Sequence, residues 1–177
     1  MKELSLNVLD VAKNSVVAGA TLVEITLLTD AEGMLTLTIK DDGCGMSEQT
    51  VKNVTDPFYT TRTTRKVGLG IPLLKLAAEQ TGGHLEIVSS QGEKHGTCVK
   101  AVFDTKSIDF TPVGDIVSTI CILIAGSPEI NFFFSDVTPQ REVSLNTDDL
   151  RAVLGEISLA EPEIQTWISE YLKEQYR

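Results

Sequence analysis

A glycine-rich loop, DDGCGM at residues 41–46, directly follows the strand-like run Met34–Lys40. Glycines adopt backbone conformations closed to other residues, and they let the main chain approach a flat ring closely. A carboxylate where a strand ends can accept a hydrogen bond from a heterocycle such as adenine. The same residues are also typical of a simple turn closed by Asp and Gly. Taken alone, this loop fits a base-binding site and a turn about equally.

Upstream of this loop, residues 2–18 are predicted to form an amphipathic helix that Gly19 ends. Asp10 and Asn14 are four residues apart and share one helical face, with Asn7 one turn before them. A carboxylate can accept a proton from water, and an amide oxygen is a hard ligand suited to Mg²⁺. The alternative is a solvated polar face. The apolar stripe comprises Leu4, Val8, Val11, Ala12 and Ser15.

Downstream, residues 54–69 are polar, basic and irregular, and they include the stretch DPFYTTR at residues 56–62. No helical or strand periodicity explains Phe58 and Tyr59, so they suit an aromatic hinge under a mobile lid or a hydrophobic plug. Arg62, Arg65 and Lys66 are expected either to reach phosphate groups or to be solvated.

The stretch Gly68-Leu69-Gly70 then opens a predicted helix that runs to about Thr81. Exposed N–H groups at a helix start attract phosphate, and glycines let the phosphate come close. A lone G-x-G is a weak signal, so this element depends on the others for its meaning.

The order and spacing of these elements resemble the GHKL, or Bergerat-fold, ATPase superfamily over residues 4–103. NSVVAGAT at residues 14–21 is similar to the N box of the MutL branch, and DDGCGM is similar to the G1 box. DPFYTTR resembles the F box of histidine kinases, and GLGI at residues 68–71 resembles the end of their G2 box. The resemblance implies an α+β fold, a two-layer α/β sandwich with a mixed sheet and helices on one face.

The resemblance also implies roles for individual residues, with ATP and Mg²⁺ as cofactors. Asn14 would be the metal ligand, Asp41 would accept the adenine amino group, and Thr97 would close the adenine side through water. Residues 54–69 would form the ATP lid. The implied nucleotide-binding residues are Asn14, Asp41, Gly43, Gly45, Met46, Lys66, Gly68, Leu69, Gly70 and Thr97.

Two positions depart from the family pattern. Asp10 stands where the hydrolytic branches place a glutamate as general base, and aspartate is shorter by one methylene group. We take Asp10 as the candidate catalytic residue, although the shorter side chain puts water activation in question. Lys66 stands where histidine kinases have the first glycine of the G2 box.

Composition excludes several other classes of protein. The net charge of −10 argues against a general nucleic-acid binder. No P-loop motif and no complete G-x-G-x-x-G motif occur. Three unpaired cysteines and the lack of a long apolar run predict a cytoplasmic protein that is not in a membrane.

We expect two segments, an ATP-binding domain over 1–105 and an extension over 106–177 packed on it. The extension is predicted to contain a helix, a hairpin and two closing helices, with Trp167 in the core. Three functions stay open: slow ATP hydrolysis, phosphoryl transfer to a partner protein as in anti-sigma-factor kinases or histidine kinases, and ATP or ADP sensing without turnover. The sequence identifies neither the regulatory or substrate protein nor the oligomeric state.

Overall fold

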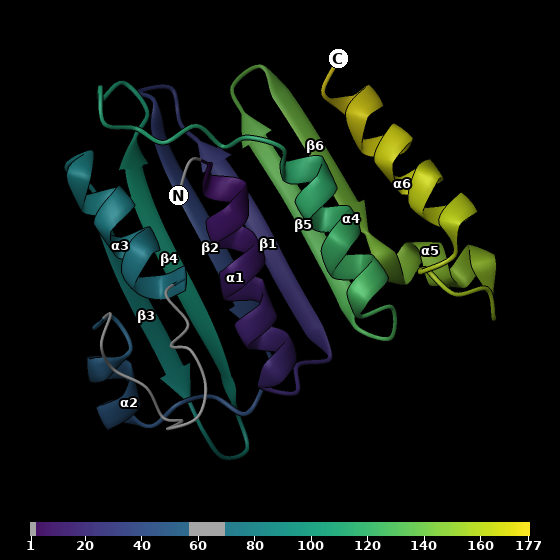
Figure 1. The fold of residues 1–177 in the computed structure, drawn as a ribbon, viewed down its shortest axis with the longest axis horizontal. Coiled ribbons are helices and arrows are strands. Elements are labelled where there is room, and N and C mark those ends of the chain that lie inside the picture. Colours follow the sequence, from purple (N-terminus) through teal and green to yellow (C-terminus); the bar gives the residue numbers. More distant parts are fainter. Residues whose placement is uncertain (1–2, 57–69) are drawn as a thin grey trace.

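The computed structural model describes residues 3–56 and 70–177. Six strands form one sheet in the order β3-β4-β2-β1-β5-β6, with helices on one face of it (Figure 1). The helices are α1 (Leu4–Val17), α2 (Glu48–Asn53), α3 (Gly70–Gln80), α4 (Ile116–Gly126), α5 (Thr147–Leu154) and α6 (Pro162–Gln175). The strands are β1 (Leu22–Thr29), β2 (Met34–Asp41), β3 (His84–Ser90), β4 (Gly96–Asp104), β5 (Asn131–Thr138) and β6 (Arg141–Asn146).

Alternation of apolar and polar residues explains why the helices lie on one side only. Along β1, Val23, Ile25 and Leu27 are buried, whereas the residues between them are less buried. A strand points successive side chains to opposite faces, so one face of the sheet is apolar and the other meets solvent. The predicted α+β architecture is confirmed.

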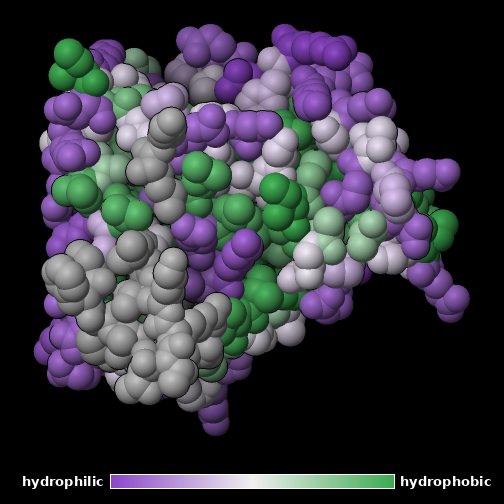
Figure 2. All heavy atoms as spheres, in the orientation of Figure 1, coloured by the Kyte–Doolittle hydropathy of each residue, from purple (hydrophilic) through white to green (hydrophobic). Residues whose placement is uncertain are grey.

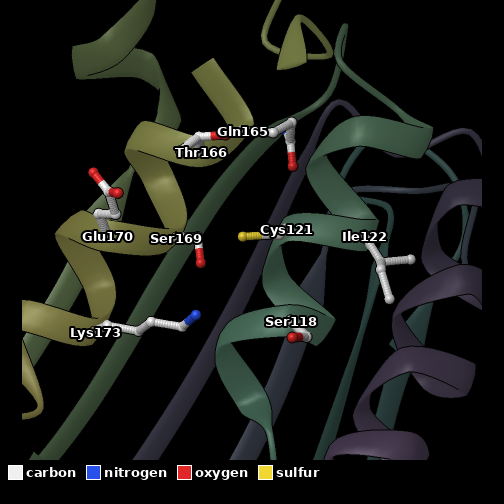
Figure 3. A pocket seen from close by; sticks show the side chains of 8 residues that line it. All are labelled: Ser118, Cys121, Ile122, Gln165, Thr166, Ser169, Glu170 and Lys173. Atoms are coloured by element: carbon white, nitrogen blue, oxygen red, sulfur yellow. The ribbon is translucent and has the colours of Figure 1, made fainter. Parts of the chain in front are cut away.

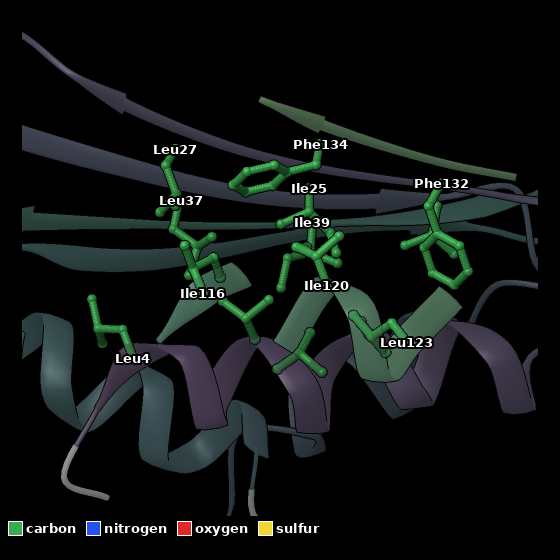
Figure 4. Packing of buried hydrophobic residues seen from close by; sticks show 14 of the residues in the cluster. Leu4, Ile25, Leu27, Leu37, Ile39, Ile116, Ile120, Leu123, Phe132 and Phe134 are labelled. Carbon is green, nitrogen blue, oxygen red and sulfur yellow. The ribbon is translucent and has the colours of Figure 1, made fainter. Parts of the chain in front are cut away.

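The core fills the space between the apolar face of the sheet and helices α1, α3 and α4 (Figure 4). Phe132 and Phe134 of β5 lie over α4, whose Ile120 and Leu123 point toward them. The core is therefore continuous from the first helix into the segment after residue 107.

The sheet is mixed because β5 pairs in parallel with β1, whereas its other strand pairs are antiparallel. Parallel strands need a crossover connection, and α4 lies in the connection from β4 to β5. The hairpin β5–β6 thus extends the same sheet that carries β1 and β2.

The start of α1 is capped by the chain that leads into α4. The N–H groups of Leu4 and Ser5 donate to the carbonyl oxygens of Pro112 and Val113, each at 2.9 Å. The first N–H groups of a helix have no partner within the helix, so these bonds satisfy two of them. They fix the beginning of the helix that carries Asp10 and Asn14.

Edge strand β6 is closed by the end of α6. The side-chain amide of Gln175 accepts from the N–H of Ser144 at 3.0 Å and donates to its carbonyl oxygen at 3.0 Å. Next to it, the Tyr176 hydroxyl donates to Asp136 at 2.7 Å, and the Arg141 guanidinium lies 4.6 Å from the centre of the Tyr176 ring. One glutamine side chain therefore replaces part of a neighbouring strand.

The prediction that Trp167 lies in the core is wrong, because 47% of its surface is exposed. Ile168 and Leu172 occupy the inward positions of α6 and are fully buried. Trp167 lies on the outward side and stacks on the ring of Tyr171, with centroids 4.9 Å apart.

On the helix side of the molecule, hydrophobic residues gather over α1 and α4 (Figure 2). Of the helices in the described ranges, none is both long and apolar enough to cross a bilayer.

Candidate functional site

The carboxylate of Asp41 is held at the end of β2 by two hydrogen bonds. The hydroxyl of Ser15 on α1 donates to one oxygen at 2.6 Å, and the N–H of Gly43 donates to the other at 2.9 Å. Asp41 is only 9% exposed and Ser15 only 3% exposed. A carboxylate has about four acceptor positions, so Asp41 keeps capacity for a further donor.

The neighbouring Asp42 has a structural role. Its carboxylate accepts from the N–H of Thr21 at 2.7 Å and the N–H of Leu22 at 3.0 Å, and also from the Thr21 hydroxyl. Burial alone would raise the pKa of Asp42, but the hydrogen bonds together hold it below its ordinary value. Asp42 thus ties the glycine-rich loop to the start of β1.

The other wall of the site is a hydroxyl network on the β3–β4 hairpin. Ser89 accepts from the N–H of Met46 at 2.8 Å and donates to the carbonyl oxygen of Gly96 at 3.1 Å. Ser89 also lies 2.7 Å from the hydroxyl of Thr97. Where the single Ser89 proton is donated to Gly96, Thr97 is the donor in the contact with Ser89. The Thr97 oxygen is then left able to accept a hydrogen bond from water or a ligand.

Close backbone packing explains the glycines of this loop. Gly45 has a φ of +76°, and a Cβ there would lie 1.8 Å from the carbonyl oxygen of Ser90. Nδ1 of His95 lies 2.7 Å from the carbonyl oxygen of Gly43. A carbonyl oxygen can only accept, so Nδ1 carries the proton and holds the loop against the hairpin.

On α1, Asp10 is half-buried and Asn14 is exposed, one turn further along the helix. Gly70 begins α3 beside Asp10, and a Cβ on Gly70 would lie 3.0 Å from the Cβ of Asp10. The structure therefore brings Asp10 next to the start of the helix predicted to receive phosphate. Asn7 differs, because it is 2% exposed, and its Nδ2 has no hydrogen-bond partner within the described part of the chain.

The remaining predicted residues, Lys66, Gly68 and Leu69, lie outside the described residues, as do the aromatic pair Phe58 and Tyr59. In the ranges 3–56 and 70–177, no group of three or more His, Cys, Asp or Glu side chains could hold a metal ion.

A known family matches the part of the chain that holds this site. Residues 1–107 match the model of the histidine kinase-, DNA gyrase B- and HSP90-like ATPase family. The chain belongs to this family. The matched region contains α1, the glycine-rich loop, α3 and the β3–β4 hairpin, so it contains every element of the site described above.

Sequence relatives of this chain include a putative sensor protein and a sensor histidine kinase. A putative sensor protein of Shewanella frigidimarina is 38% identical over 74 residues, which is 41% of this chain and 11% of that protein. Sensor histidine kinase YxdK of Bacillus subtilis is 36% identical over 87 residues, which is 47% of this chain and 26% of that protein. The chain thus spans only a small part of the length of these relatives.

Solved structures show the same fold over more of the chain. The ADP-bound MutL ATPase domain of Aquifex aeolicus covers 99% of this chain and 70% of its own, with a TM-score of 0.54 and 14% identity. The N-terminal domain of a DNA repair protein covers 88% of this chain and 58% of its own, with a TM-score of 0.61 and 14% identity. At this identity, the likeness extends to the fold alone.

Three residues of the site were not predicted as site residues from the sequence. Ser15 belongs to the apolar stripe of the predicted helix, and no motif of the sequence marks Ser89 or His95 as site residues. Their partners lie 26, 43 and 52 positions away in the chain. A small polar residue at an inward-facing helix position was the one local signal, and it was present at Ser15.

Proposed function

We propose that this ATPase domain binds ATP with Mg²⁺ and passes the energy or the γ-phosphoryl group on to a partner protein. The carrying observation is the Asp41 carboxylate, almost buried and already oriented by Ser15 and Gly43. An oriented buried acceptor beside close-packed glycines suits the exocyclic amino group of adenine. It does not suit a guanine base, which presents a carbonyl oxygen at the equivalent ring position.

The nucleotide would lie between the two walls of the site. Asp41 would accept the adenine amino group, and Thr97 would accept from a water on the same edge of the base. Gly43, Gly45 and Met46 would lie along the ring. Gly70 would offer its N–H to the phosphate groups at the start of α3. We extend the same role to Lys66, Gly68 and Leu69.

The donor set fits a magnesium ion that the nucleotide itself helps to hold. Mg²⁺ is usually bound by one or two protein oxygens together with phosphate oxygens and water. The exposed amide oxygen of Asn14 would be the protein ligand. When bound, the ion would neutralise charge on the phosphate groups.

Asp10 is the candidate general base because it lies one turn from Asn14 and next to Gly70. Its carboxylate would take the proton from water or from a hydroxyl group of a protein substrate. As aspartate, it reaches less far than glutamate would. This shorter reach favours transfer to a partner, as in protein kinases, over hydrolysis, and it also leaves nucleotide sensing without turnover as a second candidate.

The test is calorimetric titration with ATP and ADP, with and without Mg²⁺, followed by measurement of released phosphate. Asp41→Asn should abolish binding of both nucleotides, and an unchanged affinity would refute the adenine assignment. Asn14→Ala should remove the effect of Mg²⁺ on ATP affinity. Asp10→Asn should spare binding and stop phosphate release.

The results distinguish between ATP hydrolysis, phosphoryl transfer and nucleotide sensing. Phosphate release that continues at the parent rate in Asp10→Asn removes Asp10 from the chemistry. Tight binding without release, and without label transfer from [γ-³²P]ATP to proteins of a cell extract, favours the sensing function.

We further propose that residues 1–105 form the ATP-binding domain. Residues 106–177 form an extension that is packed on this domain and takes part in binding the partner protein.

A further inference from the structure

The outward side of α6 carries an alternating set of acidic and aromatic residues. They are exposed, and their spacing places them away from the buried Ile168 and Leu172. We name this set the aromatic–acidic face, and its members are Glu163, Trp167, Glu170, Tyr171 and Glu174.

The two aromatic rings are exposed as a preformed pair. Trp167 is 47% exposed and Tyr171 is 41% exposed, and their rings stack with an interplanar angle of 11°. Ring faces attract cations, and Arg stacks on them more readily than Lys. The pair therefore offers a surface for a cationic side chain.

The three glutamates have no cationic partner within 4 Å among the residues of the described ranges. Lys173, the one basic residue of α6, lies three residues from Glu170, but no ion pair within 4 Å joins it to these glutamates. Both residues line the groove of about 500 Å³ between α4 and α6, and the Lys173 side chain points across it toward Cys121 (Figure 3). With three glutamates and one neighbouring lysine, the aromatic–acidic face keeps a net negative charge.

Part of this arrangement costs the helix stability, although Glu163 lies in the first turn, where the helix dipole favours negative charge. Glu170 and Glu174 are four residues apart on one side of α6, a spacing at which like charges repel. Glu174 also lies near the C-terminal end, where the helix dipole disfavours negative charge. The wider segment shares this bias, because residues 108–177 hold almost half of the chain's 25 acidic residues and about a quarter of its 15 basic ones.

We propose that the aromatic–acidic face of α6 is a docking surface for an arginine-rich basic segment of a partner protein. Guanidinium groups stack on Trp167 and Tyr171, and neighbouring ones pair with the flanking glutamates. The complementarity of charge selects a basic segment over an acidic protein surface or a nucleic acid. This inference does not depend on the nucleotide site, which lies at the other end of the helix layer from α6 (Figure 1).

The full chain offers a direct probe, because Trp167 is its single tryptophan. Titration with a blocked hexa-arginine peptide should change the Trp167 fluorescence in a saturable way. The change should weaken as salt is raised. Hexa-lysine should bind several-fold more weakly, because it lacks the stacking of guanidinium on the rings.

Matched variants separate this face from the general negative charge. The triple variant Glu163→Gln, Glu170→Gln, Glu174→Gln should bind hexa-arginine about tenfold more weakly. A control with the same change in net charge, Glu32→Gln, Glu93→Gln, Glu142→Gln, should retain the parent affinity. Equal losses in the two triples would overturn the proposal.

A second variant tests the rings. Tyr171→Ala should reduce the preference for hexa-arginine over hexa-lysine to near unity, with thermal unfolding checked for an intact fold. A preference that stays at the parent value would refute the role of the ring pair. If sedimentation shows that the chain associates with itself through this face, so that hexa-arginine cannot compete, the occupant is a second copy and the proposal fails.

Discussion

The Ser15 hydroxyl on α1 donates to the Asp41 carboxylate at the end of β2 across 2.6 Å, with both side chains almost buried. This bond joins the helix that carries Asp10 and Asn14 to the strand end that carries the candidate adenine acceptor. Because the carboxylate is oriented in the free protein, a ligand need not order it on binding. Such preorganisation raises affinity by lowering the cost of binding.

Ser15→Ala should lower both stability and nucleotide affinity. A buried hydrogen bond to a charged group contributes about 1.5–3 kcal/mol, so we expect the free energy of unfolding to fall by about 2 kcal/mol. ADP affinity should fall about tenfold, because Asp41 loses its fixed orientation. Urea unfolding and calorimetry measure the two effects.

The control for this prediction is Ser135→Ala on the open face of β5. The Ser135 side chain has no hydrogen bond to any described residue. Its replacement by alanine should therefore change neither the free energy of unfolding nor the affinity for ADP. If Ser15→Ala leaves ADP affinity at the parent value while lowering stability, the Ser15–Asp41 bond is structural only.

Ionisation of Asp42 should make the free energy of unfolding depend on pH in the acid range. Its pKa in the folded protein is lowered, with the hydrogen bonds from Thr21 and Leu22 together outweighing burial, which acts in the opposite direction. Its contribution is therefore complete above the unfolded pKa of about 4, and it is lost as pH falls through the lower folded value. The stability difference between the parent and Asp42→Asn should shrink between pH 7 and pH 3.

Urea unfolding at the two pH values tests this. Asp109→Asn, in an exposed turn, is the control and should behave like the parent chain at both. A difference between parent and Asp42→Asn that is equally large at pH 3 and pH 7 would show that the charge of Asp42 is not the cause.

Local pattern predicted most of the fold but not the contacts that shape the site. Helical and alternating periodicity predicted α1, α3, the strand before the glycine-rich loop and the hairpin of the extension, because burial of one face sets those periods. The same rule misassigned Trp167, since Ile168 and Leu172 fill the inward positions. The bonds of Ser15, Ser89 and His95 join residues distant in the chain, so no local window could contain them.

Gly45 should tolerate no side chain. A Cβ there would lie 1.8 Å from the carbonyl oxygen of Ser90, and its φ of +76° is disfavoured for other residues. Gly45→Ala should therefore cost more than about 2 kcal/mol of unfolding free energy, since the backbone term alone is roughly 1–2 kcal/mol. Gly92→Ala is the control, because Gly92 has a φ of +93° and no atom within 4 Å of the built Cβ. Urea unfolding of both should show the larger loss at Gly45, and equal losses would contradict the close packing of the loop on Ser90.

The two hydrogen bonds between Gln175 and Ser144 should protect edge strand β6 from pairing with other chains. Its amide satisfies one N–H and one carbonyl group of that strand, and edges with unpaired groups are prone to pair with other chains. Gln175→Ala should lower the free energy of unfolding by about 1–3 kcal/mol for the two lost bonds. It should also cause concentration-dependent association. Gln140→Ala is the matched control in the exposed β5–β6 turn, where the side chain has no hydrogen bond to a described residue. Unfolding and light scattering measure the two effects. A Gln175→Ala variant that is as stable and as monodisperse as Gln140→Ala would show that α6 closes the sheet through Ile168 and Leu172 alone.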